Sequence, residues 1–403
     1  MILTDIFNIL LLIAIALIFA RILGYIFERL HQPVVIGEIL AGFFVGSFGL
    51  GMLSEKSFSI FNFTIVLPQI NFTSPDFELF ADIGILFLLF ISGLQTDIIK
   101  LKKMGKASTF SAFGGVILPL ILGLLVGLYF GYSMIVAVVI GLTLVATSVG
   151  VTVRTLMNLN ALDTTSGITI LGAAVIDDVI GIILLAFLLG IDSPLYLSIK
   201  ITIYFLIFGY LGLKIIDKIL NLGDKIQLPK ALLSISLAIL LIYAFFADKC
   251  GITGIIGGFI AGLLIGNTVI GTRQITEDIK VIGEGFFIPL FFVWVGALVD
   301  LKAFLTIGFF ALVIIFIGII GKVIGCGLGA KLAGMTNNDS LIVGIGMIPR
   351  LEMAIVTATV AISHGIITGE VASNILATTI LVCIITALIT PFMVKAITVK
   401  NRR

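Results

Sequence analysis

Two adjacent carboxylates, Asp177 and Asp178, lie in the middle of residues 172–187, a run that is otherwise apolar. A single charge at the centre of a membrane-spanning helix costs about 2.5 to 3.5 kcal/mol on insertion scales. Two adjacent charges therefore need a cationic partner, a bound cation or a proton. Lys322, in the middle of another apolar run, is a candidate partner. Because a carboxylate can hold either a proton or a hard cation, these residues predict a site where the two compete.

The two carboxylates cannot share one set of neighbours if their segment is helical. Adjacent helical residues point about 100° apart, so one carboxylate could face an aqueous cavity and the other a fixed partner. Lys322 is flanked by Gly321 and Gly325, which allow a neighbouring helix to approach. A desolvated lysine could carry a proton itself, or act only as a counter-ion in a buried ion pair. The residue types leave both roles open.

The composition indicates that these residues lie within a bundle of membrane-spanning helices. Of the 403 residues, 60% are hydrophobic and 11% are charged, against about 25% charged in a soluble domain. Apolar runs of membrane-spanning length recur from end to end, which predicts an all-α polytopic membrane protein. The predicted spans number thirteen: 6–27, 33–53, 77–98, 107–130, 133–158, 162–190, 195–216, 231–248, 251–270, 283–299, 303–330, 340–363 and 370–396.

The placement of basic residues predicts the orientation of the chain. With the N-terminus outside and an odd number of spans, the C-terminus is cytoplasmic, and most of the 24 basic residues fall on the cytoplasmic side. Lys56, Lys200, Lys249 and Lys302 then lie outside. The cytoplasmic set comprises Arg29, Lys100, Lys102, Lys103, Lys106, Arg154, Lys214, Lys218, Lys225, Lys230, Arg273, Lys280, Lys331, Lys395, Lys400, Arg402 and Arg403.

The chain contains an internal repeat. Gly37, Ala41, Gly42 and Gly46 of the second span align with Gly257, Ala261, Gly262 and Gly266 of the ninth span. Seven spans separate the two copies, and because seven is odd, the copies run in opposite directions. We therefore expect an inverted-topology repeat that relates spans 2–6 to spans 9–13, an arrangement typical of transporters with a midplane site.

Helix-breaking residues occur at matching positions of the two copies. The fifth span carries Thr147, Ser148 and Gly150 at its midpoint, and the twelfth span carries Gly344 and Pro349. Proline removes a backbone hydrogen bond and clashes with the preceding turn. Two interrupted helices in corresponding positions predict a binding site, where freed carbonyls can bind a cation and N–H ends can stabilise carboxylates.

Arg350, Glu352 and Glu38 are further charged residues within predicted spans. Arg350 and Glu352 are two residues apart, so on a regular helix they do not face each other. We expect each to pair elsewhere, or the two to pair across a broken turn, with either a structural or a gating role. Glu38 lies near a span end, where it could attract cations or pair at the interface.

The chain resembles the bacterial and archaeal sodium/proton antiporters of the monovalent cation:proton antiporter-2 family. The motifs that carry the resemblance are GAAVIDDVIGI, ATSVGVTVRTL, GMIPRLEMAIV and QPVVIGEILAGFFVGSFGLG. The resemblance covers nearly the whole chain. It implies broken helices that cross beside the aspartates, with Asp178 as the main Na⁺ carboxylate, Asp177 as the partner of Lys322, and Thr147 and Ser148 close by.

The resemblance also implies a division into domains. The core domain would comprise residues 107–190 and 303–403, the latter including a short cytoplasmic tail. The dimerisation domain would comprise 1–106 and 231–302, with a linker helix in 191–230. The core is expected to move against the dimerisation domain in an elevator-like step, within a homodimer in a prokaryotic cell membrane.

The expected activity is electrogenic exchange of intracellular Na⁺ or Li⁺ for external protons, with no cofactor and no nucleic-acid partner. We expect a transporter and not an enzyme, because no nucleophile–base pair accompanies the aspartates. Potassium/proton exchange stays open, since both cations take oxygen ligands. Sodium-coupled symport of an organic anion on a related fold is a second alternative, although it would need a larger polar cavity.

Overall fold

The computed structural model describes residues 2–30, 32–46, 49, 57–60, 63–66, 70–189, 194–225, 228–268, 274–298 and 301–400. Four residues of the charge pattern, Lys56, Arg273, Arg402 and Arg403, lie outside this part of the chain. The side chains of Lys302, Glu352 and Lys400 lie outside it as well.

Nine helical stretches in the described residues are long and apolar enough to span a membrane. They are formed by α1 (Ile2–Arg29), α3 (Pro75–Leu94), α5 (Gly105–Tyr129), α8 (Thr165–Leu189), α9–η2–α10 (Pro194–Tyr204, Phe205–Leu211, Gly212–Asp224), α11 (Ala231–Lys249), α13–η3–α14 (Gln274–Ile282, Gly283–Phe287, Ile288–Ala297), α15 (Leu301–Leu332) and α18 (Gly369–Lys400). The segments η2 and η3 are π-helical, and α15 is kinked at Gly308, where φ is +62°.

The other four predicted spans are shorter helices or pairs of short helices. The second and ninth spans are α2 (Val34–Val45) and α12 (Gly254–Gly266), both shorter than predicted. The fifth and twelfth spans are each broken, into α6 (Met134–Thr143) with α7 (Val149–Asn158), and α16 (Asn337–Gly346) with α17 (Glu352–Ser363). At 1.5 Å per residue, a ten-residue helix reaches about halfway through a bilayer core. The predicted order of spans and both predicted breaks are confirmed.

Two small elements were not predicted. Helix α4 (Ile98–Lys103) follows α3, and the carboxylate of Asp97 caps it by accepting hydrogen bonds from the N–H groups of Ile99 and Lys100. Strands β1 (Ser57–Ile60) and β2 (Phe63–Val66) form an antiparallel hairpin in which Ser57 lies opposite Val66.

Equivalent glycines of the two repeat copies make equivalent close contacts. A Cβ atom at Gly42 of α2 would lie 1.9 Å from the carbonyl oxygen of Val293 in α14. A Cβ atom at Gly262 of α12 would lie 2.1 Å from the carbonyl oxygen of Phe90 in α3. Since α2 corresponds to α12 and α14 corresponds to α3, each copy's first helix packs against the second helix of the other copy. Only glycine permits backbones to approach so closely.

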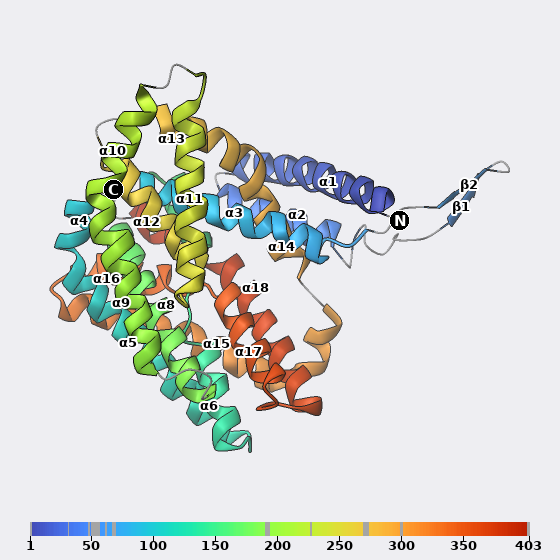
Figure 1. Cartoon of the computed structure of the whole chain (residues 1–403). Helices are drawn as coiled ribbons and strands as arrows, with labels where there is room; N and C mark the ends of the chain where they lie inside the picture. The colour runs from blue at the N-terminus through green and yellow to red at the C-terminus, as the bar shows by residue number, and fades with distance from the viewer. Residues whose placement is uncertain are drawn as a thin grey trace.

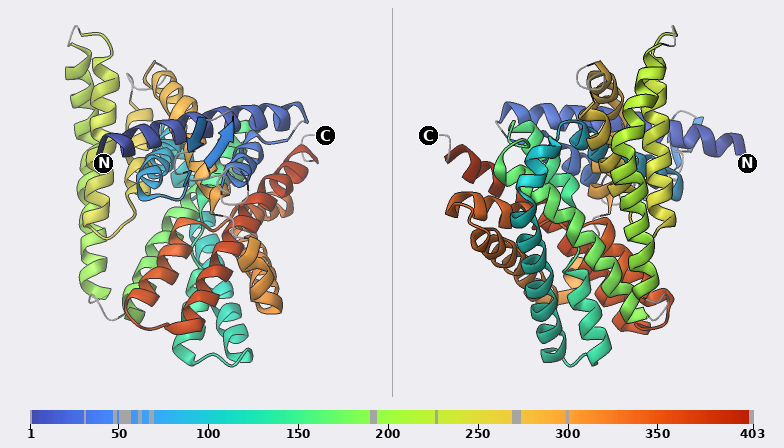
Figure 2. Two further views of the ribbon diagram at one scale, coloured as in Figure 1. Left: turned by 90° about the vertical axis from the view of Figure 1, so that its right-hand side faces the viewer. Right: turned by 60° about the vertical axis from the view of Figure 1, so that its left-hand side comes forward.

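The helices gather into two bundles. In the first bundle α5 and α15 pack together, and α6, α7, α8, α16, α17 and α18 surround them. In the second bundle α2, α3, α12 and α14 pack together, and α1, η2, α10, α11 and α13 cover them. Figures 1 and 2 show the first bundle in the lower part of the molecule, with α1, α2, α3 and α14 above it.

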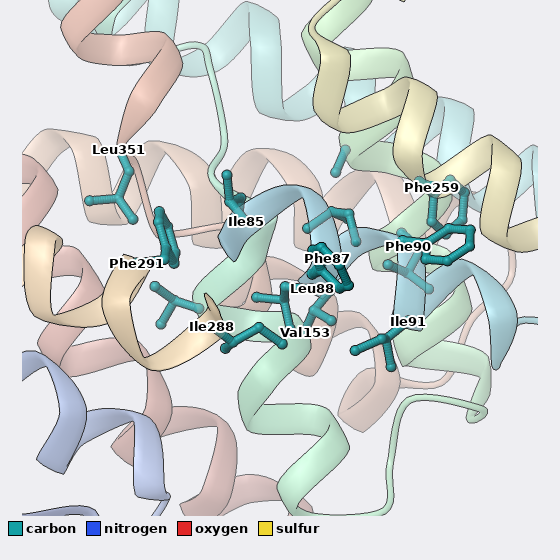
Figure 3. Close-up of a cluster of buried hydrophobic side chains, with 14 of the residues drawn as sticks. Ile85, Phe87, Leu88, Phe90, Ile91, Val153, Phe259, Ile288, Phe291 and Leu351 are labelled. Carbon is teal, nitrogen blue, oxygen red and sulfur yellow. The ribbon is translucent and has the colours of Figure 1, made fainter. Parts of the chain in front are cut away.

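The two bundles meet through apolar side chains. Figure 3 shows Val153 of α7 and Leu351, which directly precedes α17, in one cluster with Ile85, Leu88 and Phe291 of the second bundle. These side chains are at most 3% exposed. The broken helices are therefore seated directly on α3 and α14.

Candidate functional site

Asp177 and Lys322 form a completely buried ion pair at the centre of the first bundle. Asp177 lies midway along α8 and Lys322 in the second half of α15, and both are 0% exposed. Lys322 Nζ donates a hydrogen bond of 2.7 Å to Asp177 Oδ2. The lysine that the sequence singled out is thus in direct contact with one of the two aspartates.

Thr147 is a second hydrogen-bond donor to the Asp177 carboxylate. Its hydroxyl donates to the same oxygen, Oδ2, over 2.6 Å. The other oxygen, Oδ1, is buried and accepts no hydrogen bond from the residues that the structure describes. A carboxylate with both donors on one oxygen keeps the second oxygen available for a proton or a cation.

The two broken helices cross beside this pair. The N–H of Ser148, which precedes α7, donates to the carbonyl of Pro349 over 2.8 Å. Thr152 Oγ1 donates to the carbonyl of Gly346, where α16 ends, over 2.7 Å. The breaks thus face each other, as their matched positions in the sequence suggested. The positive N-terminal ends of α7 and α17 and the negative C-terminal ends of α6 and α16 meet at this crossing.

Arg350 lies inside the second break with its guanidinium bound to backbone carbonyls. It is 0% exposed. Its Nε and Nη2 donate to the carbonyl of Leu144 at the end of α6, Nη2 also donates to Gly318, and Nη1 donates to Ile348. The cation therefore stabilises the negative end of a half-helix, which supports the structural alternative over the gating one.

Asp178 is partly exposed, unlike its neighbour. Its position one residue further along α8 directs its carboxylate about 100° around the helix axis from that of Asp177. Ser148 Oγ is buried and has no hydrogen-bond partner in the described part of the chain. The structure thus distinguishes a fully buried aspartate, Asp177, from a partly exposed one, Asp178.

Several comparisons with known proteins bear on this site. Residues 12–400 match the family described as sodium/hydrogen exchanger, transmembrane. The chain belongs to the sodium/hydrogen exchanger family. It is 32% identical over 397 residues to the Na⁺/H⁺ antiporter of Enterococcus hirae, covering 96% of this chain and 98% of that protein. It is also 32% identical over 388 residues to the Na⁺/H⁺-K⁺ antiporter GerN of Bacillus cereus, covering 95% and 94%.

A solved structure shares the fold of this exchanger. The sodium proton antiporter MjNhaP1 of Methanocaldococcus jannaschii superposes with a TM-score of 0.69 over 98% of this chain and 99% of that one, at 20% identity. Family membership confirms the antiporter resemblance and makes the protein a multi-pass membrane transporter and not an enzyme.

The exchanger also contains a buried charge cluster that links its two bundles. Arg154 of α7 lies 3.2 Å from Glu284 of η3 and 3.9 Å from Glu38 of α2. Glu38 is 0% exposed, Arg154 is 5% exposed, and the side chain of Glu284 is 36% exposed. Arg21 of α1 adds a hydrogen bond to the backbone carbonyl of Glu284.

The cluster pairs two charged residues that were predicted separately. Arg154, one of the basic residues predicted on the cytoplasmic side, has its guanidinium buried between helices, and its side of the membrane stays a prediction. Glu38 pairs with it and does not stand alone at a span end. A signal was present, because Arg154 lies only two turns after the predicted break and is followed by more apolar residues. Its partner Glu284 could not be named, since it lies in a distant helix.

Proposed function

We propose that the protein exchanges Na⁺, or Li⁺, for protons at a site formed by Asp177, Asp178 and Lys322. The observation that carries this proposal is the fully buried Asp177–Lys322 pair, joined over 2.7 Å beside two opposed helix breaks. Membership of the sodium/hydrogen exchanger family supports it, as does the resemblance to a Na⁺/H⁺ antiporter over 96% of the chain.

In this proposal the two aspartates have different roles. Asp178 is the main cation carboxylate because it is partly exposed, whereas Asp177 is fully buried. Asp177 is the partner of Lys322, and Thr147 and Ser148 supply nearby oxygen atoms of the kind that hard cations prefer. Arriving Na⁺ displaces protons from Asp178 and from the Asp177–Lys322 pair, so that the site holds either the cation or the protons.

With Lys322 as a second proton carrier, two protons exchange for one Na⁺, and transport is electrogenic. Moving one net charge across 100 mV is worth about 2.3 kcal/mol, which drives the cycle toward sodium export when the cytoplasm is negative. Lys322 suits this role because it is fully buried and has a single carboxylate partner among the described residues.

The movement that we propose is an elevator step. Residues 107–190 and 303–403 form the moving core, and 1–106 and 231–302 form the dimerisation domain, with a linker in 191–230. The apolar contact between the bundles supports the step, because apolar surfaces slide without losing hydrogen bonds. The Arg154 cluster is the ionic contact that such a step has to break and remake.

The chain would lie in the cell membrane of a prokaryote as a homodimer, with its N-terminus outside and its C-terminus in the cytoplasm. The asymmetric distribution of lysine and arginine supports this orientation. Under it, α4 and the ends of α10 and α18 face the cytoplasm, and the β1–β2 hairpin faces outward.

Exchange of K⁺ for protons is a second candidate. It is favoured by the 32% identity to GerN of Bacillus cereus, whose name includes K⁺ as well as Na⁺. Carboxylates, hydroxyls and carbonyls accept both ions, so the ligand types do not discriminate between them.

Proton flux in sealed proteoliposomes tests the proposal, with Na⁺, Li⁺ or K⁺ added in turn. We expect saturable proton movement with Na⁺ and Li⁺ in the wild type and in Asp248→Asn, a control carboxylate that is 71% exposed. Asp178→Asn should abolish it. Lys322→Ala should make any remaining exchange insensitive to an imposed membrane potential. If no added cation moves protons in the wild type, the exchange function is wrong.

A further inference from the structure

A large apolar pocket lies between the two bundles, away from the Arg154 cluster. Its volume is about 380 Å³, and its walls come from α4, α5 and α8 on one side and from η2, α10 and α12 on the other. Ile176, Phe205, Phe259 and Leu264 are typical of its lining. The volume is in the range of small-molecule sites, which are usually concave and mostly apolar.

Two of the three hydroxyl groups in the lining, those of Ser108 and Thr109, are already satisfied by the protein, and the third belongs to Tyr210. Ser108 Oγ donates to the carbonyl of Thr169, and Thr109 Oγ1 donates to the carbonyl of Gly105. No acidic or basic side chain lines the walls. A hydrated cation would find no carboxylate and only three side-chain hydroxyls in this lining, so the pocket suits an apolar ligand.

Exposed lysines neighbour lining residues on both sides of the pocket. Leu101 of α4 lines one side, and Lys102, Lys103 and Lys106 are exposed in the same segment. Across the pocket, the ammonium of Lys214 lies 5.5 Å from the ring centre of Tyr210, which also lines the pocket. None of these four lysines is in an ion pair within the described part of the chain.

The acidic groups nearby are already engaged. Asp163 pairs with Lys100, and Asp97 caps α4. The remaining charge near these lysines is therefore positive, except for Asp217, one turn beyond Lys214 on α10. Basic residues at the ends of membrane helices attract anionic lipid headgroups.

We propose that the pocket binds one acyl chain of an anionic phospholipid, with the phosphate held by Lys102, Lys103, Lys106 and Lys214. The apolar walls accept the chain, and the lysines select the headgroup. The neighbouring surface is also suited to lipid, because Ile99, Tyr210 and Leu213 are at least 50% exposed.

Two glycines allow the pocket to be filled selectively. A Cβ atom at Gly209 or at Gly105 would meet no other atom within 4 Å, and both residues line the pocket. Gly209→Leu and Gly105→Leu therefore place a side chain in the space of the acyl chain. Ile207→Phe is the matched control, because it adds bulk to the same helical segment at a side chain that is 47% exposed and outside the lining.

The test is photolabelling of the full-length protein in phosphatidylcholine vesicles that contain a trace of phosphatidylglycerol with a diazirine in its acyl chain. Labelled peptides are identified by mass spectrometry after purification of monodisperse protein. We expect labels on α5, η2 and α12 in the wild type and in Ile207→Phe, and at least a fivefold loss in both glycine variants. Changing Lys102, Lys103 and Lys106 to glutamine should reduce labelling by phosphatidylglycerol but not by a diazirine phosphatidylcholine.

The proposal is overturned if both glycine variants keep wild-type labelling of these peptides. It is also overturned if the phosphatidylcholine probe labels them as strongly as the phosphatidylglycerol probe, since the lysines then select nothing. Labelling by a diazirine fatty acid, but by neither phospholipid, would assign the pocket to a free fatty acid and overturn the phospholipid proposal.

Discussion

Arg350 donates hydrogen bonds from both Nε and Nη2 to the carbonyl oxygen of Leu144, over 3.1 and 3.0 Å, although 206 residues separate them in the chain. Leu144 is the residue at which α6 ends in the middle of the molecule. A half-helix that stops within a membrane leaves carbonyls without partners, and water cannot satisfy them there. The guanidinium of one broken helix therefore satisfies the end of the other.

Replacing Arg350 by methionine should destabilise the protein strongly. The change leaves the carbonyls of Leu144, Gly318 and Ile348 buried without these donors, at about 1 to 3 kcal/mol for each unsatisfied group. Arg350→Lys should recover only part of the loss, because an ammonium cannot reproduce the planar fork of a guanidinium. Thermal unfolding of the purified protein measures both variants, with the exposed Lys249→Met as the control. A wild-type melting temperature for Arg350→Met would contradict this role.

The Asp177–Lys322 pair should behave as one energetic unit. Lys322→Met alone leaves a buried carboxylate without its cation, which typically costs about 3 to 5 kcal/mol. The double variant Asp177→Asn/Lys322→Met should lose less stability than the sum of the losses in the two single variants. The exposed pair Asp248–Lys249 provides the comparison, because surface pairs contribute about 0 to 1 kcal/mol. Additive losses of stability in the buried pair would argue against direct coupling.

Thr147 should tune the affinity of the site for Na⁺. Thr147→Val keeps the shape of the side chain but removes the 2.6 Å hydrogen bond to Asp177 Oδ2. Such a bond contributes about 1.5 to 3 kcal/mol when one partner is charged, which is about ten- to a hundredfold in an equilibrium constant. We expect the half-saturating Na⁺ concentration to change by at least fivefold, in sodium-dependent proton flux. Thr147→Ser keeps the hydroxyl and should have the half-saturating Na⁺ concentration of the wild type. If Thr147→Val and Thr147→Ser have the same half-saturating concentration, the hydroxyl does not set the affinity.

The charges of the Arg154 cluster should also be energetically coupled, here across the two bundles. Arg154→Met leaves Glu38 buried without its cation and should cost about 3 to 5 kcal/mol. Adding Glu38→Gln should restore much of that stability, whereas adding Glu284→Gln should restore less, because Glu284 is partly exposed to solvent. Thermal unfolding of the three variants distinguishes these outcomes. If Glu38→Gln and Glu284→Gln restore the stability of Arg154→Met equally, the burial of Glu38 does not determine the loss.

The sequence was sufficient to predict the membrane-spanning helices and to single out the charged residues at their centre. Apolar runs of membrane-spanning length indicate helices because a bilayer offers no other partner for the backbone. The bilayer also singles out Asp177, Asp178 and Lys322, because a charge inside an apolar run is energetically costly. Such a charge is expected to have a function or a partner. The helix breaks at Thr147–Ser148 and at Pro349 could also be predicted, because proline and poor helix formers destabilise the helical turn in which they lie.

Only the tertiary structure decided which groups meet. Lys322 binds Asp177, which is 145 residues away in the chain. Arg350 binds backbone carbonyls, and because every residue has one, the sequence does not indicate which carbonyls are bound. The burial of Arg154 depends on α2 and η3, which are remote in the chain, so the sequence did not predict it. The lipid-sized pocket likewise exists only where α5 and α8 face η2 and α12. Local propensities and the membrane determine each helix, whereas partners and cavities arise from the packing of helices against one another.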